Sequence, residues 1–154
     1  MQNIENKERM EGWKVQSSDE NGFHKVITPD TCECKEAQMF RLNLPAGESY
    51  ILESGELEMH PVLLKGKARL SGHKELNQEM EKFDSCYIPG DEYLTITAEE
   101  DCIFYIAGAK YEGIGEPHFR KFDISLPIGE VHQIHGEDRK STRLNSSHQK
   151  ISYA

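Results

Sequence analysis

The sequence predicts an all-β domain, either a sandwich or a jelly-roll barrel. Two observations favour it: apolar and polar residues alternate in about seven or eight short runs, and Gly, Pro and Asp turn signals separate these runs roughly every eight to twelve residues. A chain of 154 residues is one domain by length, and such a domain buries about two-thirds of its unfolded surface. We therefore expect one barrel with an apolar core that needs no disulfide.

The first predicted strands are "FHKVIT" (residues 23–28) and "AQMFRLNL" (residues 37–44). The second run alternates with a period of two, which is typical of a half-buried strand. "PAGES" (residues 45–49) predicts a turn, and "YILES" (residues 50–54) follows it as the next strand. These runs account for the first part of the barrel.

"EMHPVLL" (residues 58–64) and "KARL" (residues 67–70) flank a Lys65-Gly66 break and predict a hairpin. Because Pro61 cannot donate to a strand ladder, we expect its run at a sheet edge or at a bulge. The polar stretch "SGHKELNQEMEKFD" (residues 71–84) predicts a charged loop between strands, with a short helical turn within it as the alternative.

"CYIPGDEYLTITA" (residues 86–98) predicts a strand, a tight turn and another strand. "DCIFYIAGAK" (residues 101–110) is largely apolar on both faces, which indicates a strand in the middle of a sandwich. After a loop, "HFRKFDI" (residues 118–124) predicts a short strand, and "LPIGEVHQIHG" (residues 126–136) an extended segment that runs out of the domain.

These elements divide the chain into four predicted parts. A flexible N-terminal segment covers residues 1–20, a barrel residues 21–126, and a connection toward a second barrel residues 127–137, with a tail at 138–154. The tail stretch "DRKSTRLNSSH" resembles the translation of a sequencing adapter, and "ISYA" resembles the adjoining adapter segment. We therefore expect a non-native tail behind the front part of a longer protein.

Composition narrows the class of protein. The formal charge of −9 argues against nucleic acid or an anionic membrane as a partner. The sequence shows neither an apolar run long enough for a membrane span nor the apolar core of a signal peptide, so we expect a soluble, cytoplasmic protein. Cys32, Cys34, Cys86 and Cys102 are then expected to be reduced thiols. The first two could form a soft metal corner, but no second pair completes a zinc pattern; the last two are expected to be small buried groups.

Small jelly rolls of the cupin class bind a metal through a His-x-His pair, a carboxylate and a further histidine, all facing the barrel interior. Here the first stretch reads "SYILESGEL", and Leu94 stands where the last histidine would be. Glu58 and His60 lie near the carboxylate position but are too few to hold a metal. We expect no catalytic, cofactor-binding or metal-binding residue in this chain.

The other histidines carry no clear pattern. His24 and His73 lie in polar surroundings and are expected to be solvated, while His118 opens a strand and its role stays open. His132 and His135 are three residues apart, a spacing that aligns side chains only on a helix, which the neighbouring glycines disfavour. A role for them at the seam with a following domain stays open.

The order "FRLNLPAGESY…HPVLLKGKARLSG…CYIPGDEYLTITAEEDCIFYIAGAK", followed by "FRKFDISLPIGEVHQIHG", resembles the amino-terminal half of the 5-deoxy-glucuronate isomerase family across residues 20–137. The resemblance implies the metal-free first barrel of a bicupin from inositol catabolism, which interconverts 5-deoxy-glucuronate and 2-deoxy-5-keto-gluconate. It places the divalent metal, which stabilises the charge that develops as a carbonyl moves, in a second barrel. The small-molecule sugar acid is thus a substrate of the parent protein, and the fragment is expected to be inactive.

Other classes of function stay open. A stand-alone, metal-free cupin could bind a sugar acid through Arg41 or Arg69, although the net charge repels uronates. A barrel that serves only homo-oligomerisation would expose an apolar face near residues 119–128. The nearest enzymatic alternative is the pectin-uronate isomerases, which share the bicupin plan.

Overall fold

The structure is a computed structural model that describes residues 11, 14–123, 125, 131–133 and 142–144. The chain divides into two compact units, residues 1–122 and 123–154. Within the described residues, the first unit holds strands β1 to β10 and one short 3₁₀ helix, and the second holds β11 and β12. The all-β prediction is confirmed.

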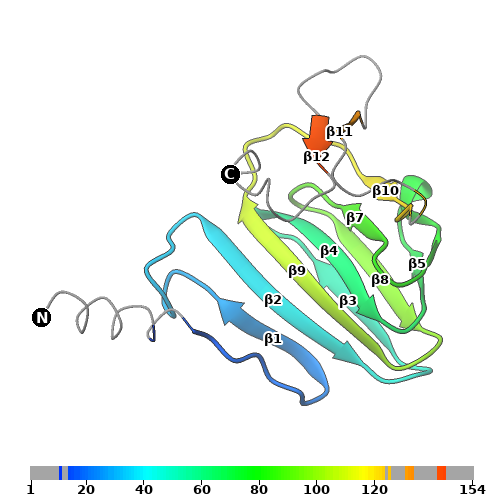
Figure 1. Cartoon of the computed structure of the whole chain (residues 1–154), viewed down its shortest axis with the longest axis horizontal. Coiled ribbons are helices and arrows are strands. Elements are labelled where there is room, and N and C mark those ends of the chain that lie inside the picture. Colours follow the sequence, from blue (N-terminus) through cyan, green and yellow to red (C-terminus); the bar gives the residue numbers. More distant parts are fainter. Residues whose placement is uncertain (1–10, 12–13, 124, 126–130, 134–141, 145–154) are drawn as a thin grey trace, which may run out of the picture. The chain divides into compact units, whose positions relative to one another are not determined.

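The larger sheet of the first unit has six strands in the order β1-β2-β9-β4-β7-β10, all paired antiparallel (Figure 1). In that order, their bounds are Gly22–Ile27, Ala37–Leu44, Cys102–Lys110, Leu57–Lys65, Ser85–Tyr87 and His118–Arg120. Strand β9 lies between β2 and β4, so its predicted place in the middle of a sheet is confirmed. Its inward face is buried, whereas its outward face is only partly covered.

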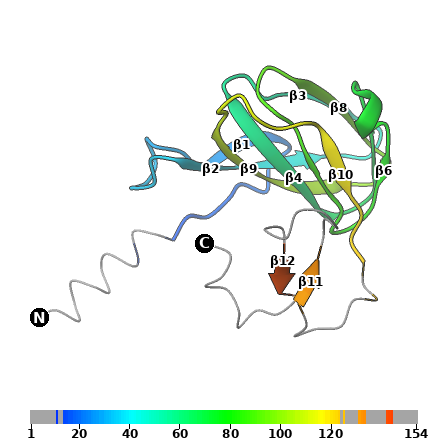
Figure 2. The same ribbon diagram turned by 90° about the horizontal axis from the view of Figure 1, so that it is seen from above.

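The smaller sheet has four strands in the order β3-β8-β5-β6. Their bounds are Ser49–Glu53, Tyr93–Ala98, Ala68–Ser71 and Glu79–Met80. Figure 2 shows β3 and β8 facing β4 and β9 across the interior of the barrel. The arrangement is the predicted jelly-roll barrel, because two antiparallel sheets enclose one core.

The core lies between these two sheets and is apolar. Every strand with an alternating burial pattern turns its apolar positions inward, as the period-two runs predicted. Leu42, Leu63, Phe104 and Ile106 are fully buried from the larger sheet. Burying a side chain of this size contributes about 1.5–3 kcal/mol, so this cluster is the main source of the fold's stability.

Three stacked aromatic rings join the two sheets. Phe23 of β1 stacks on Phe40 of β2 with ring centroids 5.1 Å apart, and on Tyr50 of β3 at 5.6 Å. Stacked pairs of this kind add about 0.5–1.5 kcal/mol beyond the area they bury. The stack therefore ties the strand β1 to both halves of the barrel.

The prediction placed the run of Pro61 at a sheet edge or at a bulge. The edge is wrong, because β4 is an interior strand between β9 and β7; a register shift does occur in this strand, between Leu63 and Lys65. The neighbours of Pro61 explain how the ladder tolerates it. The Met59 N–H donates to the Ile88 carbonyl at 2.9 Å, and the Leu63 N–H donates to the Asp84 carbonyl at 3.1 Å. The pairs Met59↔Ile88 and Val62↔Ser85 share one register, which places Pro61 opposite Cys86, so one ladder bond is absent at Pro61 and the bonds of Met59 and Leu63 hold the strands together on either side.

In residues 71–84 the short helical turn named as the alternative is present, but the prediction of a charged loop for the rest is wrong in part. This stretch contains the 3₁₀ helix η1 (Lys74–Leu76) and the strand β6. Leu76 and Met80 are fully buried, with 0% exposure each, and both belong to the core. Two isolated apolar residues in a polar run gave no periodic signal, yet each of them is buried.

The turn between β4 and β5 contains Gly66, whose replacement is expected to destabilise the fold. Gly66 has a φ of 91°, and a Cβ there would overlap the Asp101 carbonyl oxygen and lie 3.0 Å from the Cys102 sulfur. We expect Gly66→Ala to lower the free energy of unfolding by about 2–3 kcal/mol in urea denaturation, since it combines a left-handed backbone with an overlap against main chain.

Gly47 is the matched control for this experiment. Its φ is 85°, but a Cβ there meets nothing within 4 Å. Gly47→Ala is therefore expected to cost only the backbone penalty of about 1 kcal/mol. Equal losses for the two variants would mean that the contact with Asp101 does not constrain Gly66.

In the second unit, β11 (Val131–Gln133) pairs antiparallel with β12 (Thr142–Leu144), which places His132 opposite Arg143. His135 lies outside the described residues, as do most of the predicted connection and tail. The four predicted parts of the chain, including the non-native tail that would contain β12, therefore stay predictions.

Candidate functional site

A tightly packed leucine, Leu94, occupies the position at which the cupin pattern has its last metal-binding histidine. Leu94 is 0% exposed and pairs in register with Leu52 of the neighbouring strand, which is 1% exposed. The next inward residue of β8, Ile96, is also fully buried. This part of the interior offers methyl groups and no donor atom, so it cannot ligate a cation.

Glu58 and His60 do not face the interior. Along β4 the buried residues alternate with them, which places Met59 and Leu63 inward and both polar residues on the outer face of the sheet. They lie near the carboxylate position of the cupin pattern in sequence, but on the folded strand neither side chain faces the interior. Among the residues that the structure describes, no group of three or more His, Cys, Asp or Glu side chains is placed to hold a metal ion.

Glu58 instead forms a polar contact on the outer face. The Tyr87 hydroxyl donates to its carboxylate at 2.6 Å, and Tyr87 pairs in register with His118 of β10. Burial, and then the hydrogen bond to Glu58, raise the pKa of Tyr87 above its usual range, so it remains a neutral donor. A Cβ at Gly115 would overlap this hydroxyl, which shows that the loop after β9 packs directly on it.

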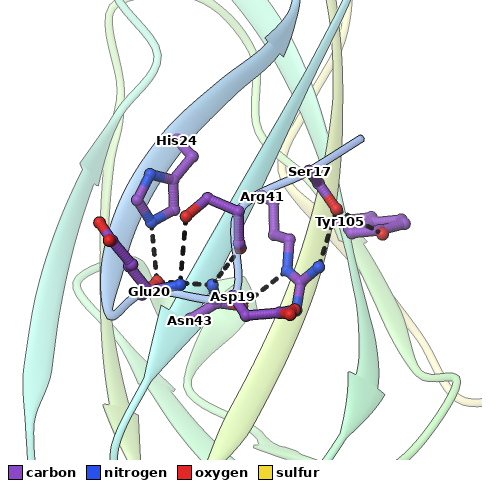
Figure 3. A network of polar contacts seen from close by, with 8 residues as sticks. Ser17, Asp19, Glu20, His24, Arg41, Asn43 and Tyr105 are labelled. Atoms are coloured by element: carbon purple, nitrogen blue, oxygen red, sulfur yellow. Dashed lines mark hydrogen bonds and ion pairs between the residues drawn. The ribbon is translucent and has the colours of Figure 1, made fainter. Parts of the chain in front are cut away.

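Arg41 is the centre of a polar network on the outer face of the same sheet (Figure 3). Its Nε donates to the Asn43 Oδ1 at 2.8 Å, its Nη1 to the Ser17 Oγ at 2.7 Å, and its Nη2 to the Asp19 Oδ1 at 2.9 Å. The guanidinium also lies 5.8 Å from the Tyr105 ring centroid, within the range of a cation–π contact. Its nitrogens are thus engaged within the chain.

The partner segment in this network, Ser17–Glu20, is called the N-terminal strap below. Asn43 fastens it further, because its Nδ2 donates to the carbonyl oxygens of Ser18 and Glu20, both at 2.7 Å. The His24 Nε2 forms a hydrogen bond with the same Glu20 carbonyl at 2.7 Å, and the side chain is half-buried. His24 is therefore not simply solvated, as the sequence had suggested. The strap was not predicted from the sequence. Arg41 and Asn43, two polar residues on one face of β2, are the signal that could have indicated a polar partner for that face.

Arg69 and His73 have local partners. Arg69 is exposed and forms an ion pair with Glu79 at 2.9 Å. The His73 Nδ1 accepts the Glu75 N–H at 3.1 Å and so caps the helix η1. Neither of the two arginines considered for a sugar acid therefore points into the barrel.

Residues 119–128, where a barrel that serves only oligomerisation would expose an apolar face, include both packed and exposed side chains. Phe119 packs against the core, whereas Phe122 is 47% exposed and meets the 45% exposed Phe83 edge-on at 5.4 Å. The buried Asp84 carboxylate holds this corner, since it accepts the Phe122 N–H at 2.8 Å and the Lys121 Nζ at 3.2 Å. Most of residues 123–128 lie outside the described residues, so the predicted face is seen only in part.

The cysteines fall into two groups. Cys86 and Cys102 are buried, as expected, and burial raises the pKa of the Cys86 thiol to about 12. Cys32 and Cys34 lie in the loop between β1 and β2, where Cys34 is exposed. In the part of the chain that the structure describes, no helix has the length and apolar character needed to cross a bilayer.

The two-sheet barrel is a cupin, the double-stranded β-helix class. An RmlC-like cupin with this fold from Methanocaldococcus jannaschii is similar to the chain at a TM-score of 0.53 and 14% identity, over 64% of this chain and 90% of that one. A variant of Bacillus subtilis oxalate decarboxylase matches at a TM-score of 0.52 and 17% identity, over 63% of this chain and 28% of that one. These likenesses establish the fold alone.

Within that class, the chain belongs to the KduI/IolB family, whose model matches residues 13–124. This family consists of sugar isomerases and includes 5-deoxy-glucuronate isomerase. An IolB-like protein from Salmonella typhimurium matches at a TM-score of 0.58 and 22% identity, over 68% of this chain. The chain spans 44% of the length of that protein. No curated protein matches the chain.

Proposed function

We propose that this chain is the non-catalytic first barrel of a sugar isomerase of the KduI/IolB family. One observation carries the proposal: a barrel of this family has apolar side chains, Leu94 against Leu52, at the place where a cupin would hold its metal. Such a barrel can contribute folding and assembly to an enzyme, and the described interior positions around Leu94 offer a sugar no polar group.

The substrate in this proposal is 5-deoxy-glucuronate, converted to 2-deoxy-5-keto-gluconate by the parent protein. Support comes from the closing sequence "PIGEVHQIHG" (residues 127–136), the more specific part of the resemblance to the inositol branch of the family. A cytoplasmic location belongs to the same proposal, and a homo-oligomer is compatible with it.

The residues described here do not fit a divalent metal, because the inward positions around Leu94 are hydrocarbon and the carboxylate of Glu58 is engaged by Tyr87 on the outer face. No step of the isomerisation is therefore assigned to this barrel. In the proposal, the metal and its histidine and glutamate ligands belong to a second barrel of the parent protein, which also spans the length that this chain lacks relative to the IolB-like structure.

The direct test is an activity assay with two proteins. The purified 154-residue chain, supplied with 5-deoxy-glucuronate and a panel of divalent ions, is expected to form no 2-deoxy-5-keto-gluconate. The parent, expressed from the recovered reading frame, is expected to form it. Turnover by the chain alone would contradict the non-catalytic role, and a parent that isomerises only a pectin-derived uronate would move the substrate to the related branch.

A second candidate is a stand-alone cupin that binds a sugar acid. The observation in its favour is that the chain covers 90% of the single-barrel cupin from Methanocaldococcus jannaschii, so one barrel of this size exists by itself. Calorimetric titration with glucuronate separates the two candidates. We expect no heat of binding, because Arg41 is engaged by the strap and Arg69 by Glu79; saturable binding would favour the stand-alone module.

A further inference from the structure

The loop between β1 and β2 is a preorganised turn that the proposed isomerase function does not use. The Thr28 carbonyl accepts four hydrogen bonds, from the Thr31 N–H at 3.0 Å, the Cys32 N–H at 3.3 Å, the Thr31 hydroxyl at 3.2 Å and the Cys32 thiol at 3.7 Å. The Thr31 hydroxyl oxygen in turn accepts the Thr28 N–H at 2.8 Å. Thr28 itself is buried, so the turn is anchored to the barrel where β1 ends.

This turn brings two thiols together. The Cys34 N–H donates to the Cys32 sulfur at 3.2 Å, and contact with the Cys32 thiol raises the pKa of Cys34. Cys34 is exposed and Cys32 half-buried, so both sulfurs can be reached from solvent.

The geometry points to a two-thiolate site at Cys32 and Cys34, and we propose that it binds a soft monovalent metal ion of the copper(I) type. Thiolates are the ligands that select copper(I). Zinc needs four ligands, and the described residues place no third His, Cys, Asp or Glu within reach of the pair. Binding replaces the two thiol protons by one ion and releases the protons to solvent, so no electron is transferred.

The remaining thiols do not compete for the ion. Cys86 is 0% exposed and Cys102 2% exposed, so neither sulfur is open to an ion from solvent. The acidic chain, with a formal charge of −9, favours a cation over an anion at an exposed loop. The site is separate from the barrel interior, so its presence or absence leaves the isomerase proposal unaffected.

The test is a competition titration of the reduced full chain with copper(I) bicinchoninate under ascorbate, after its free thiols have been counted. One copper(I) ion per chain is expected to transfer to the protein. Cys32→Ser and Cys34→Ser are each expected to weaken binding by more than about 100-fold, a larger loss than removal of an outer-shell partner gives. Cys102→Ser, which keeps a donor for the Lys67 carbonyl, is the control that should bind as the wild type does.

Three outcomes would overturn the proposal. The wild-type chain could fail to compete for the ion, or the Cys34→Ser variant could bind with unchanged affinity. One ion shared by two chains, with a dimer seen by size-exclusion chromatography, would show a bridge between copies and not a site within one loop. Far-ultraviolet circular dichroism of each variant checks that a loss of binding does not come from unfolding.

Discussion

Replacing Leu94 by histidine is expected to destabilise the barrel by about 2–4 kcal/mol and to create no metal site. Leu94 is fully buried against Leu52, so the change loses buried hydrocarbon and leaves an imidazole without a hydrogen-bond partner. A single histidine among apolar side chains cannot complete a coordination shell. Urea denaturation should give the same midpoint with and without added Zn²⁺ or Mn²⁺.

Leu94→Met is the matched control, since it keeps the volume and the apolar character of the side chain. It is expected to cost less than about 1.5 kcal/mol. If divalent metal instead raised the unfolding midpoint of the histidine variant and not that of the methionine variant, ligands would be present inside the barrel. The account of a metal-free interior would then be wrong.

Arg41→Met is expected to lower the free energy of unfolding by about 2–3 kcal/mol. The change removes donors to Ser17, Asp19 and the buried Asn43 amide oxygen, which are 2.7–2.9 Å from the guanidinium. Asp19 is 90% exposed, so most of the loss comes from the buried side of the network and little from the ion pair. The N-terminal strap should become accessible, and hydrogen exchange of residues 17–20 measures this directly.

Arg69→Met is the control for this change. Arg69 and Glu79 form an ion pair of the same 2.9 Å length, but both side chains are more than half exposed. An exposed pair contributes about 0–1 kcal/mol, so the control should change stability little and leave the exchange of the strap unchanged. Equal effects from the two arginines would mean that burial of the Arg41 network is not what stabilises the strap.

The strand prediction succeeded where the signal was local. The run of residues 37–44 coincides with β2, and the motif at residues 86–98 forms β7, a turn and β8 as predicted. In both, the alternation of apolar and polar residues is set by the period of the strand itself. The inward residues could be assigned because that alternation fixes the face on which each side chain lies.

The predictions failed where a distant partner decides the outcome. Pro61 is tolerated in an interior strand because the hydrogen bonds of Met59 and Leu63 to the facing strand hold the ladder on either side of it, a fact of tertiary pairing. Leu76 and Met80 are buried by strands that approach from elsewhere in the sequence. Local propensity carries no information on either, and tertiary packing overrides it.

For the candidate site, too, local features could be predicted from the sequence and long-range contacts could not. Leu94 at a cupin ligand position was visible in the sequence, and the structure adds only that Leu52 lies opposite. The outward direction of Glu58 and the engagement of Arg41 by residues about 25 positions away could not be read from spacing, because both depend on which surfaces meet in the fold. The thiol pair in the loop depends on the hydrogen bonds around Thr28.

The central claim is that this barrel is the front part of a family isomerase whose chemistry is done elsewhere. The most direct measurement is a long sequencing read of the source DNA across codon 137. The account predicts that the frame continues past "HQIHGE" into a second barrel with a histidine pair, a glutamate and a further histidine. A genomic frame that encodes "DRKSTRLNSSH" and stops soon afterwards would contradict it.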